Sequence, residues 1–261
     1  MNLVFTLGVA VALAAAARST WSPCGLSMLS TITPITEQGR GRRYAATVPW
    51  YLLGAIAGGA TLGGIAALAA IPVGAVDIPE MTVFAIIGLF GVVSIFSDLG
   101  VKGFRLPRHG RQVDRLWLDH YRSWVYGTGF GWQIGVGLAT YIVTTAVYVT
   151  VLIAILTGSP IQALTIGLVF GGVRGLAIFL GAGATSLDKL HELHRSLTRF
   201  EPASRVVMFA IQAVVATLAI GEAWGTAAGN VALALMMTVG VFMLRRGRVR
   251  PMVPEQTPNP V

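Results

Sequence analysis

The chain has 261 residues, of which 54% are hydrophobic and 11% are charged, and its formal net charge is +8. Soluble domains carry roughly 25% charged residues, so this composition excludes an ordinary soluble domain and indicates an all-α polytopic membrane protein. The positive charge does not indicate a nucleic-acid partner, because the basic residues fall in short segments between apolar runs, where the orientation signals of membrane proteins lie.

The first apolar segment is predicted to be helical from about residue 2 to residue 35, which is too long for one simple span. It lacks a positively charged start, so we expect it to stay as a helix and not to be cleaved as a signal peptide. Pro23 and Pro34 interrupt it, because proline removes a backbone donor and clashes with the preceding turn. Cys24, Ser27 and Thr31 have the spacing that places them on one helix face.

Six further apolar helices are predicted along the chain, at about residues 45–71, 81–97, 126–156, 161–184, 205–220 and 226–244. The second helix carries two Gly-x-x-x-Gly patterns, starting at Gly54 and Gly59, which favour close helix packing. The polar segment 98–123 places Leu116, Trp117 and Tyr121 on an apolar side. We expect part of it to lie on the membrane surface as an amphipathic helix.

The charges of the connections predict the orientation. The segments after the first, third, fifth and seventh helices are basic, whereas those after the second, fourth and sixth contain no Lys or Arg. This alternation follows the positive-inside rule. It predicts a multi-pass protein of the plasma membrane with its N-terminus outside and its C-terminus in the cytoplasm.

With this orientation, the helices form two three-helix units that run in opposite directions. The predicted fold is a 3+3 inverted-repeat helical bundle with a seventh helix, an arrangement common in transporters. The boundaries are 1–99 for the first repeat, 100–125 for a basic cytoplasmic loop, 126–222 for the second repeat, 223–244 for an extra helix and 245–261 for a cytoplasmic tail. Trp21-Ser22-Pro23-Cys24 and Trp132-Gln133-Ile134-Gly135 occupy corresponding places in the two repeats, which points to a site near the bilayer midplane.

The segment Trp21-Ser22-Pro23-Cys24, with the later Pro34, resembles the Ser-Pro-Cys motif of the cytochrome c biogenesis thiol-reductant transporters. These are the CcdA type, which match the central membrane domain of DsbD. Phe130-Gly131-Trp132 resembles the start of their second motif, Phe-Gly-Trp-Thr-Pro-Cys. The resemblance covers the layout of about residues 1–220 and is specific only in these short segments.

The resemblance implies transfer of reducing equivalents from cytoplasmic thioredoxin to thiol proteins outside, through one cysteine in each repeat. Ile134 and Gly135 stand where the second Pro-Cys would be, and Cys24 is the chain's single cysteine. Thiol exchange passes through a mixed disulfide that a second thiol must resolve. The chain therefore cannot run this cycle with its own cysteines.

Two main hypotheses follow. We favour a transporter-like protein, not an enzyme, that moves a small solute or serves as an accessory membrane subunit without an internal redox pair. The alternative is a thiol-disulfide electron carrier that uses Cys24 with the thiol of a partner such as a thioredoxin-like protein. A third possibility is a scaffold subunit among other membrane subunits.

Arg174 lies near the middle of the predicted fifth helix. A charge near the bilayer centre costs about 2.5–3.5 kcal/mol even on the insertion scale, so we expect Arg174 to face the bundle interior and to bind an anionic group of a substrate. The alternatives are a structural ion pair, with Glu222 as one candidate partner, or a snorkelling side chain. Arg18 is expected near the outer surface, where snorkelling explains it.

The predicted site combines residues from both interrupted helices with the buried arginine. Cys24 is its catalytic residue only if the protein works by redox chemistry; otherwise it is a small apolar residue at a kink. His191-Glu192-Leu193-His194 departs from the His-Glu-x-x-His zinc pattern, so no metal or other cofactor is expected. The predicted substrate-binding residues are Pro23, Cys24, Ser27, Thr31, Trp132, Gln133 and Arg174.

Overall fold

The computed structural model describes residues 3–101, 104–107, 121–138 and 140–245. This part of the chain contains helices and no strand, as the all-α prediction requires. Five helical segments are long and apolar enough to cross a membrane: α1 with the short helix η1 (Leu3–Trp21), α4 (Tyr44–Ala75), α5 (Glu80–Leu99), α9 with η3 (Pro160–Gly181) and α10 (Leu187–Trp224).

Shorter helices complete the bundle. Of these, α8 (Ala146–Leu156) and the apolar part of α11 (Thr226–Arg245) are too short to meet the same length criterion. The others are α2 (Pro23–Thr31), α3 (Pro34–Gly39) and α7 (Ser123–Val136).

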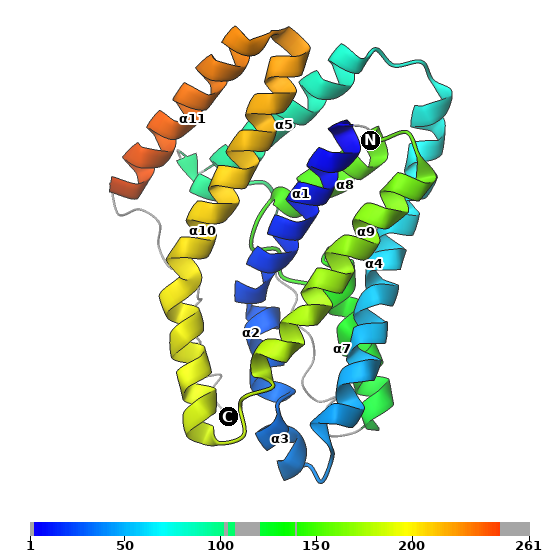
Figure 1. Ribbon diagram of the computed structural model, residues 1–261, viewed down its shortest axis with the longest axis vertical. Helices are drawn as coiled ribbons and strands as arrows, with labels where there is room; N and C mark the ends of the chain where they lie inside the picture. Colours follow the sequence, from blue (N-terminus) through cyan, green and yellow to red (C-terminus); the bar gives the residue numbers. More distant parts are fainter. Residues whose placement is uncertain (1–2, 102–103, 108–120, 139, 246–261) are drawn as a thin grey trace.

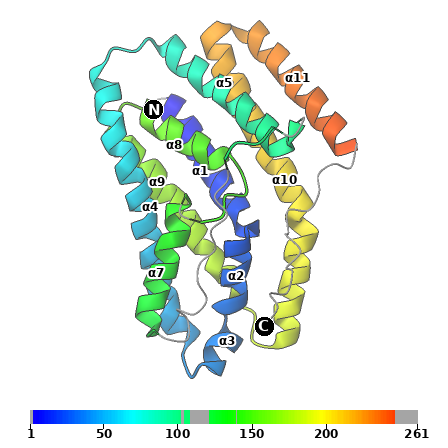
Figure 2. The same cartoon turned by 180° about the vertical axis from the view of Figure 1, so that it is seen from behind.

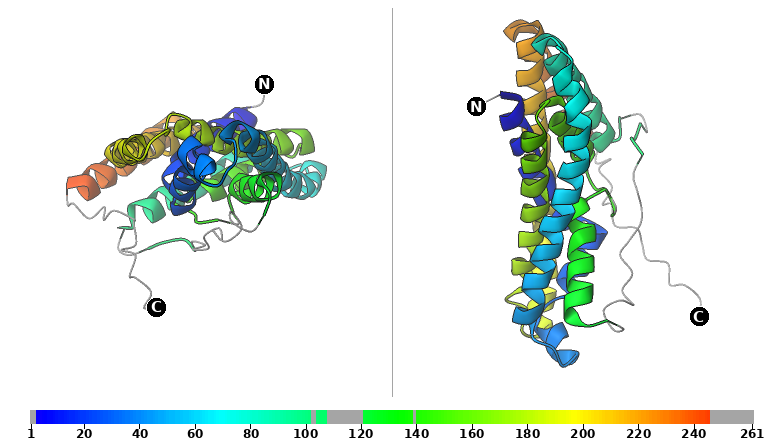
Figure 3. Two further views of the ribbon diagram at one scale, coloured as in Figure 1. Left: turned by 90° about the horizontal axis from the view of Figure 1, so that it is seen from below. Right: turned by 90° about the vertical axis from the view of Figure 1, so that its right-hand side faces the viewer.

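The helices lie along the long axis of a bundle that is much broader than it is deep (Figures 1 and 3). In Figure 1, α1, α5, α9 and α11 run downward, whereas α4, α7, α8 and α10 run upward. The unit of α1, α4 and α5 therefore runs opposite to the unit of α7–α8, α9 and α10, which is the relation that an inverted repeat requires. Figure 2 shows the same arrangement from behind.

The first helix is interrupted between α1 and α2, as Pro23 predicted. The chain forms the short helix η1 (Ser19–Trp21), and Ser22 then adopts an extended conformation. The Ser22 hydroxyl caps α2 by accepting a hydrogen bond from the amide of Gly25 at 3.0 Å. Pro23 is the first residue of α2, where its missing N–H costs no helical hydrogen bond.

The single helix predicted over residues 126–156 is wrong. The structure divides it into α7 and α8, and the segment between them is not helical among its described residues. Gly137 ends α7 with a φ of +71°, a backbone conformation that favours glycine. Each repeat therefore begins with an interrupted helix.

A buried polar network fixes the start of α8. The Asp98 carboxylate, at the end of α5, accepts hydrogen bonds from the Thr144 hydroxyl at 2.6 Å and from the amide of Thr145 at 2.9 Å. A carboxylate at a helix N-terminus also favours the helix dipole. The Thr145 and Ser94 hydroxyls lie 2.6 Å apart, and Gln212 of α10 donates to Ser94 at 3.0 Å. The network thus joins α5, α8 and α10.

The two glycine patterns of α4 face two different helices. A Cβ atom on Gly54 would lie 2.2 Å from the backbone oxygen of Thr128 in α7. On Gly59 it would lie 2.5 Å from the backbone oxygen of Gly167 in α9. Side chains at these positions would block the contacts, so the predicted close packing is present on both sides of α4.

The helix predicted at 205–220 begins much earlier, because α10 starts at Leu187. The segment 185–204, expected as a cytoplasmic loop, is therefore mostly helix. Ser186 caps it by accepting from the amide of Lys189 at 3.3 Å, and Leu197 is buried. Hydropathy alone misses such a helix, because one face is polar. The amphipathic helix expected around Leu116 and Trp117 lies outside the described residues.

Candidate functional site at the centre of the bundle

Arg174 lies in the last turn of α9 and is 4% exposed. Its guanidinium group lies over the ring of Phe170, with 5.5 Å between Cζ and the ring centroid. Among the described residues, no carboxylate forms an ion pair with it. Arg174 therefore faces the interior, as predicted. A structural ion pair, the alternative explanation for this arginine, is not found among the described residues.

A small cavity lies beside Arg174, with a volume of about 10 Å³. Its lining includes Ser19, Thr20 and Gly25 from the interruption between α1 and α2, and Ile134 from α7. Gly25 follows Cys24 directly, and Ile134 belongs to the second motif segment. The two segments singled out in the sequence therefore meet at one cavity, and Arg174 forms part of its wall.

Cys24 is 1% exposed and is the second residue of α2. Cys24 and Tyr51 of α4 lie within electrostatic range of Arg174, although neither lines the cavity. Tyr51 is fully buried, and its hydroxyl has no hydrogen-bond partner in the described part of the chain. A guanidinium, a thiol and an unsatisfied phenol thus share one buried neighbourhood, which we name the central site (Cys24, Tyr51 and Arg174 with the adjoining cavity).

The other predicted site residues lie at different places. Ser27 is buried one turn after Cys24, and Thr31 donates its hydroxyl to the Ser27 carbonyl at 2.7 Å within α2. Trp132 is 41% exposed and donates to the Thr61 hydroxyl at 3.1 Å on the outer surface of the bundle. Gln133 is half-buried and does not line the cavity. The structure therefore brings Cys24 and Arg174 together and leaves Trp132 outside.

Arg18 is 5% exposed, so its predicted place near the outer surface is wrong. It donates to the Glu201 carboxylate at 2.8 Å, and Arg205 donates to the same oxygen at 2.5 Å. The early start of α10 explains the difference, because it carries Glu201 into the bundle. Glu222, the predicted candidate partner of Arg174, lines a different cavity.

A fully buried carboxylate lies where α2 and α3 meet α4 and α7. Glu37 is fully buried and accepts hydrogen bonds from the Tyr126 hydroxyl and from the Thr47 hydroxyl, the latter at 2.5 Å. Arg40 donates to Glu37 at 3.3 Å and to the Thr31 carbonyl at 2.7 Å. This cluster ties the end of the first interrupted helix to the second helix of its own repeat and to the other repeat.

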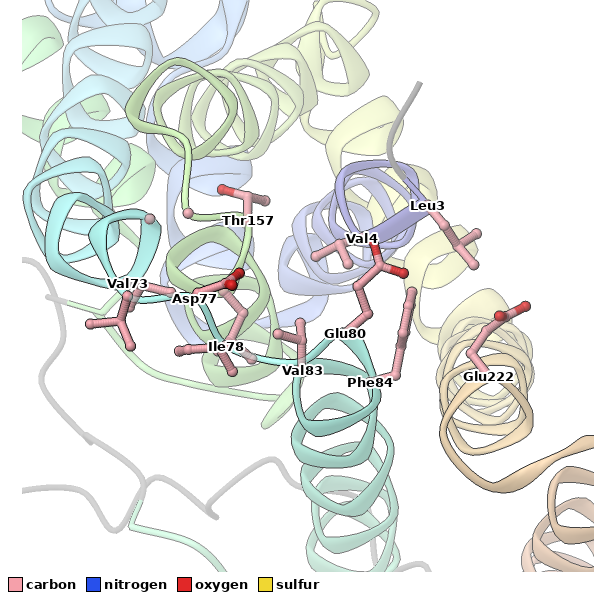
Figure 4. A pocket seen from close by; sticks show the side chains of 14 residues that line it. Leu3, Val4, Val73, Asp77, Ile78, Glu80, Val83, Phe84, Thr157 and Glu222 are labelled. Atoms are coloured by element: carbon pink, nitrogen blue, oxygen red, sulfur yellow. The ribbon is translucent and has the colours of Figure 1, made fainter.

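A larger cavity, with a volume of about 460 Å³, lies at the end of the bundle where α1 begins. Figure 4 shows Asp77 and Glu80 around the α4–α5 connection and Glu222 near the end of α10. Its described lining contains no Lys or Arg. This end of the bundle is thus acidic, in contrast to the basic connections that the sequence places at the opposite end.

Comparison with known proteins identifies relatives. The chain is similar to methylamine utilization protein MauF of Paracoccus denitrificans, with 31% identity over 66% of this chain and 62% of that protein. It is also similar to MauF of Paracoccus versutus, with 28% identity over 84% of this chain and 80% of the relative. It is similar as well to MauF of Methylophilus methylotrophus, with 32% identity over 61% of this chain and 56% of that protein.

The chain thus spans less than two thirds of the Paracoccus denitrificans and Methylophilus methylotrophus relatives. No protein-family model matches the chain, and no solved structure matches it. The relatives carry a different name from the thiol-reductant transporters, so the likeness of the two motifs to that family stays a resemblance between short segments.

Proposed function

We propose that this chain is an accessory membrane protein of methylamine utilization that recognises a small anionic solute at its central site. The observation that carries the anionic preference is the burial of Arg174 without a carboxylate partner among the described residues. The link to methylamine utilization comes from the relatives, which carry that description in their names.

The layout of the bundle supports a transporter-like function for the site. Each three-helix unit begins with an interrupted helix, and Gly25 of the first motif segment and Ile134 of the second line the same cavity. Transporters with inverted repeats hold their substrates between interrupted helices near the midplane. The proposed location is the plasma membrane with the N-terminus outside, so that the acidic cavity faces outward and the Arg40 region faces the cytoplasm.

A thiol carrier is the second candidate, and the proximity of Cys24 to Arg174 is what favours it. Against it, Cys24 is 1% exposed, and Ile134 and Gly135 stand where the resemblance places the second Pro-Cys. Disulfide exchange requires access for the partner thiol, so solute recognition is the better supported function.

Deletion of the gene in its host tests the proposed role. The deletion strain should grow poorly on methylamine and normally on an unrelated substrate, and the intact gene should restore growth on methylamine. Restoration by Cys24→Ala at equal membrane levels is the expected result for solute recognition. Normal growth of the deletion strain on methylamine would refute the proposed role. If Cys24→Ala fails to restore growth and a mixed disulfide can be trapped on Cys24 of the wild type, the thiol carrier would be favoured.

A further inference from the structure

We propose that the first part of α10 (residues 187–200) is a strap that closes the bundle over the first interrupted helix and swings away at the turn before Pro202. The strap controls access to the central site. It deepens the proposed function and rests on it only for the identity of the solute that enters. The packing of α10, its contacts with α1 and α2, and the position of its proline support the assignment.

The two parts of α10 are packed very differently. Among residues 187–207, all of which the structure describes, Leu197 is the one buried residue, whereas eight buried residues follow between Met208 and Ala223. The second part packs closely on α5, where a Cβ atom on Gly88 would lie 2.6 Å from the Ile220 side chain. Segments with few buried apolar contacts open at low cost in free energy. The strap can therefore detach while the rest of α10 stays in place.

The strap runs antiparallel to the interruption between α1 and α2. The His194 Nε2 and Ser30 Oγ atoms lie 2.9 Å apart, and the Trp21 indole donates to the Leu197 carbonyl at 2.7 Å. Residue numbers thus rise along α10 as they fall along α2 and η1. Glu201, which binds Arg18 at 2.8 Å and Arg205 at 2.5 Å, continues this line and anchors the end of the strap.

The strap covers the residues that lead to the central site. Leu197 belongs to the same buried apolar cluster as Cys24 and Met28. Met28 also lines the cavity beside Arg174. Displacement of the strap would withdraw Leu197 from this cluster and expose the side of α2 that carries Cys24. The closed strap therefore accounts for part of the burial of Cys24.

Pro202 provides the hinge. It lies inside α10, and because proline has no N–H to donate, the Thr198 carbonyl lacks its helical hydrogen-bond partner. Sharp helix bends concentrate at such positions. Pro202 and Ala203 are exposed, so a bend here disturbs no packed core. The missing hydrogen bond thus lies at the boundary between the strap and its anchor at Glu201.

Maleimide labelling of Cys24 tests the proposal, because Cys24 is the chain's single cysteine. The full chain in lipid nanodiscs presents both faces of the bilayer to the reagent, so the result does not depend on orientation. Trp21→Phe and His194→Ala each remove one strap contact. Each should raise the labelling rate about fivefold, and the double variant about 25-fold, from the net contribution of one hydrogen bond to an opening equilibrium. His191→Ala, on the exposed face of α10, is the matched control and should label at the wild-type rate.

Hydrogen exchange separates opening of the strap from loosening of the whole bundle. In the double variant, the amides of residues 190–197 should exchange faster than in the wild type, and those of α9 should exchange at the wild-type rate. If the double variant does not fold, the two single variants carry the same comparison.

Three results would overturn the proposal: an unchanged labelling rate in the folded variants, an equal increase in His191→Ala, or faster labelling accompanied by faster exchange throughout α9. Growth of the deletion strain on methylamine tests the proposed function separately. Failure of the strap and failure of that function are therefore distinguishable.

Discussion

The Cys24 thiol and the Arg174 guanidinium, which come from opposite halves of the chain, are both buried and lie within electrostatic range of each other. Cys24 is the second residue of α2, directly after the first interruption, and Arg174 lies in the last turn of α9. The first motif and the buried arginine, which two different features of the sequence indicate, therefore lie in the same region of the fold. The central site is therefore a product of the tertiary fold and not of one local motif.

Replacement of Arg174 by leucine should leave stability unchanged or raised. A buried charge without a partner contributes desolvation cost, and its replacement by an apolar side chain is often neutral or stabilising. The measurement is the thermal unfolding midpoint of the purified chain, with Arg199→Leu as the control. A large fall in the midpoint specific to Arg174→Leu would show that the guanidinium has a structural partner.

Cys24 should react slowly with thiol reagents in intact membranes. Its side chain is 1% exposed, so a small permeant maleimide should label it slowly and a bulky impermeant one should not label it. Reduced thioredoxin should change neither rate, because solute recognition involves no thiol exchange. Labelling that depends on thioredoxin would contradict this expectation and support the second candidate function.

Replacement of Glu37 by glutamine should destabilise the protein by about 3 kcal/mol, the lower end of the cost of breaking a buried ion pair. The substitution removes the charge that Arg40 and two hydroxyl groups recognise. The unfolding midpoint should fall clearly, and Tyr126→Phe should lower it less. Glu192→Gln, on the exposed face of α10, controls for the loss of one acid. Equal midpoints for Glu37→Gln and Glu192→Gln would rule out this structural role.

Replacement of Asp98 by alanine should loosen the start of α8. Two threonine groups would lose a charged acceptor, and each such hydrogen bond is worth about 1.5–3 kcal/mol. Hydrogen exchange at the amides of residues 145–149 should become faster than in the wild type. Asp77→Ala, in the exposed α4–α5 connection, is the comparison. Unchanged exchange in Asp98→Ala would mean that the network does not hold the second interruption.

The glycines of α4 offer a matched pair. Gly54→Ala should destabilise the bundle by about 1–3 kcal/mol, because the new methyl group meets the Thr128 backbone oxygen at 2.2 Å and overpacking has this cost. Gly64→Ala meets nothing within 4 Å and should be neutral or stabilising, since alanine favours helix. The unfolding midpoints of the two variants decide the matter. A similar midpoint for both would contradict the close contact between α4 and α7.

The apolar runs predicted the helices α4, α5 and α11 to within a few residues, because continuous hydrophobicity dominates there. Pro23 also predicted the first interruption. The second interruption has no proline, and its stabilising contact comes from Asp98, which is distant in sequence. Sequence periodicity cannot show such a contact.

The same limit applies to the site. Arg174 was identifiable because a charge within an apolar run is unusual. Tyr51 was not, because a tyrosine in an apolar helix looks like ordinary core, and its unsatisfied hydroxyl appears only in the fold. The motif predicts Trp132 as a substrate-binding residue, but α7 places it against Thr61 on the outer surface of the bundle.

Growth on methylamine tests whether function depends on the anionic preference of Arg174. The deletion strain would carry the wild type, Arg174→Leu, Arg174→Lys or Arg199→Leu at equal membrane levels. We expect loss of growth with Arg174→Leu, partial growth with Arg174→Lys and full growth with Arg199→Leu. Full growth with a folded Arg174→Leu protein would contradict this expectation and remove Arg174 from the functional site.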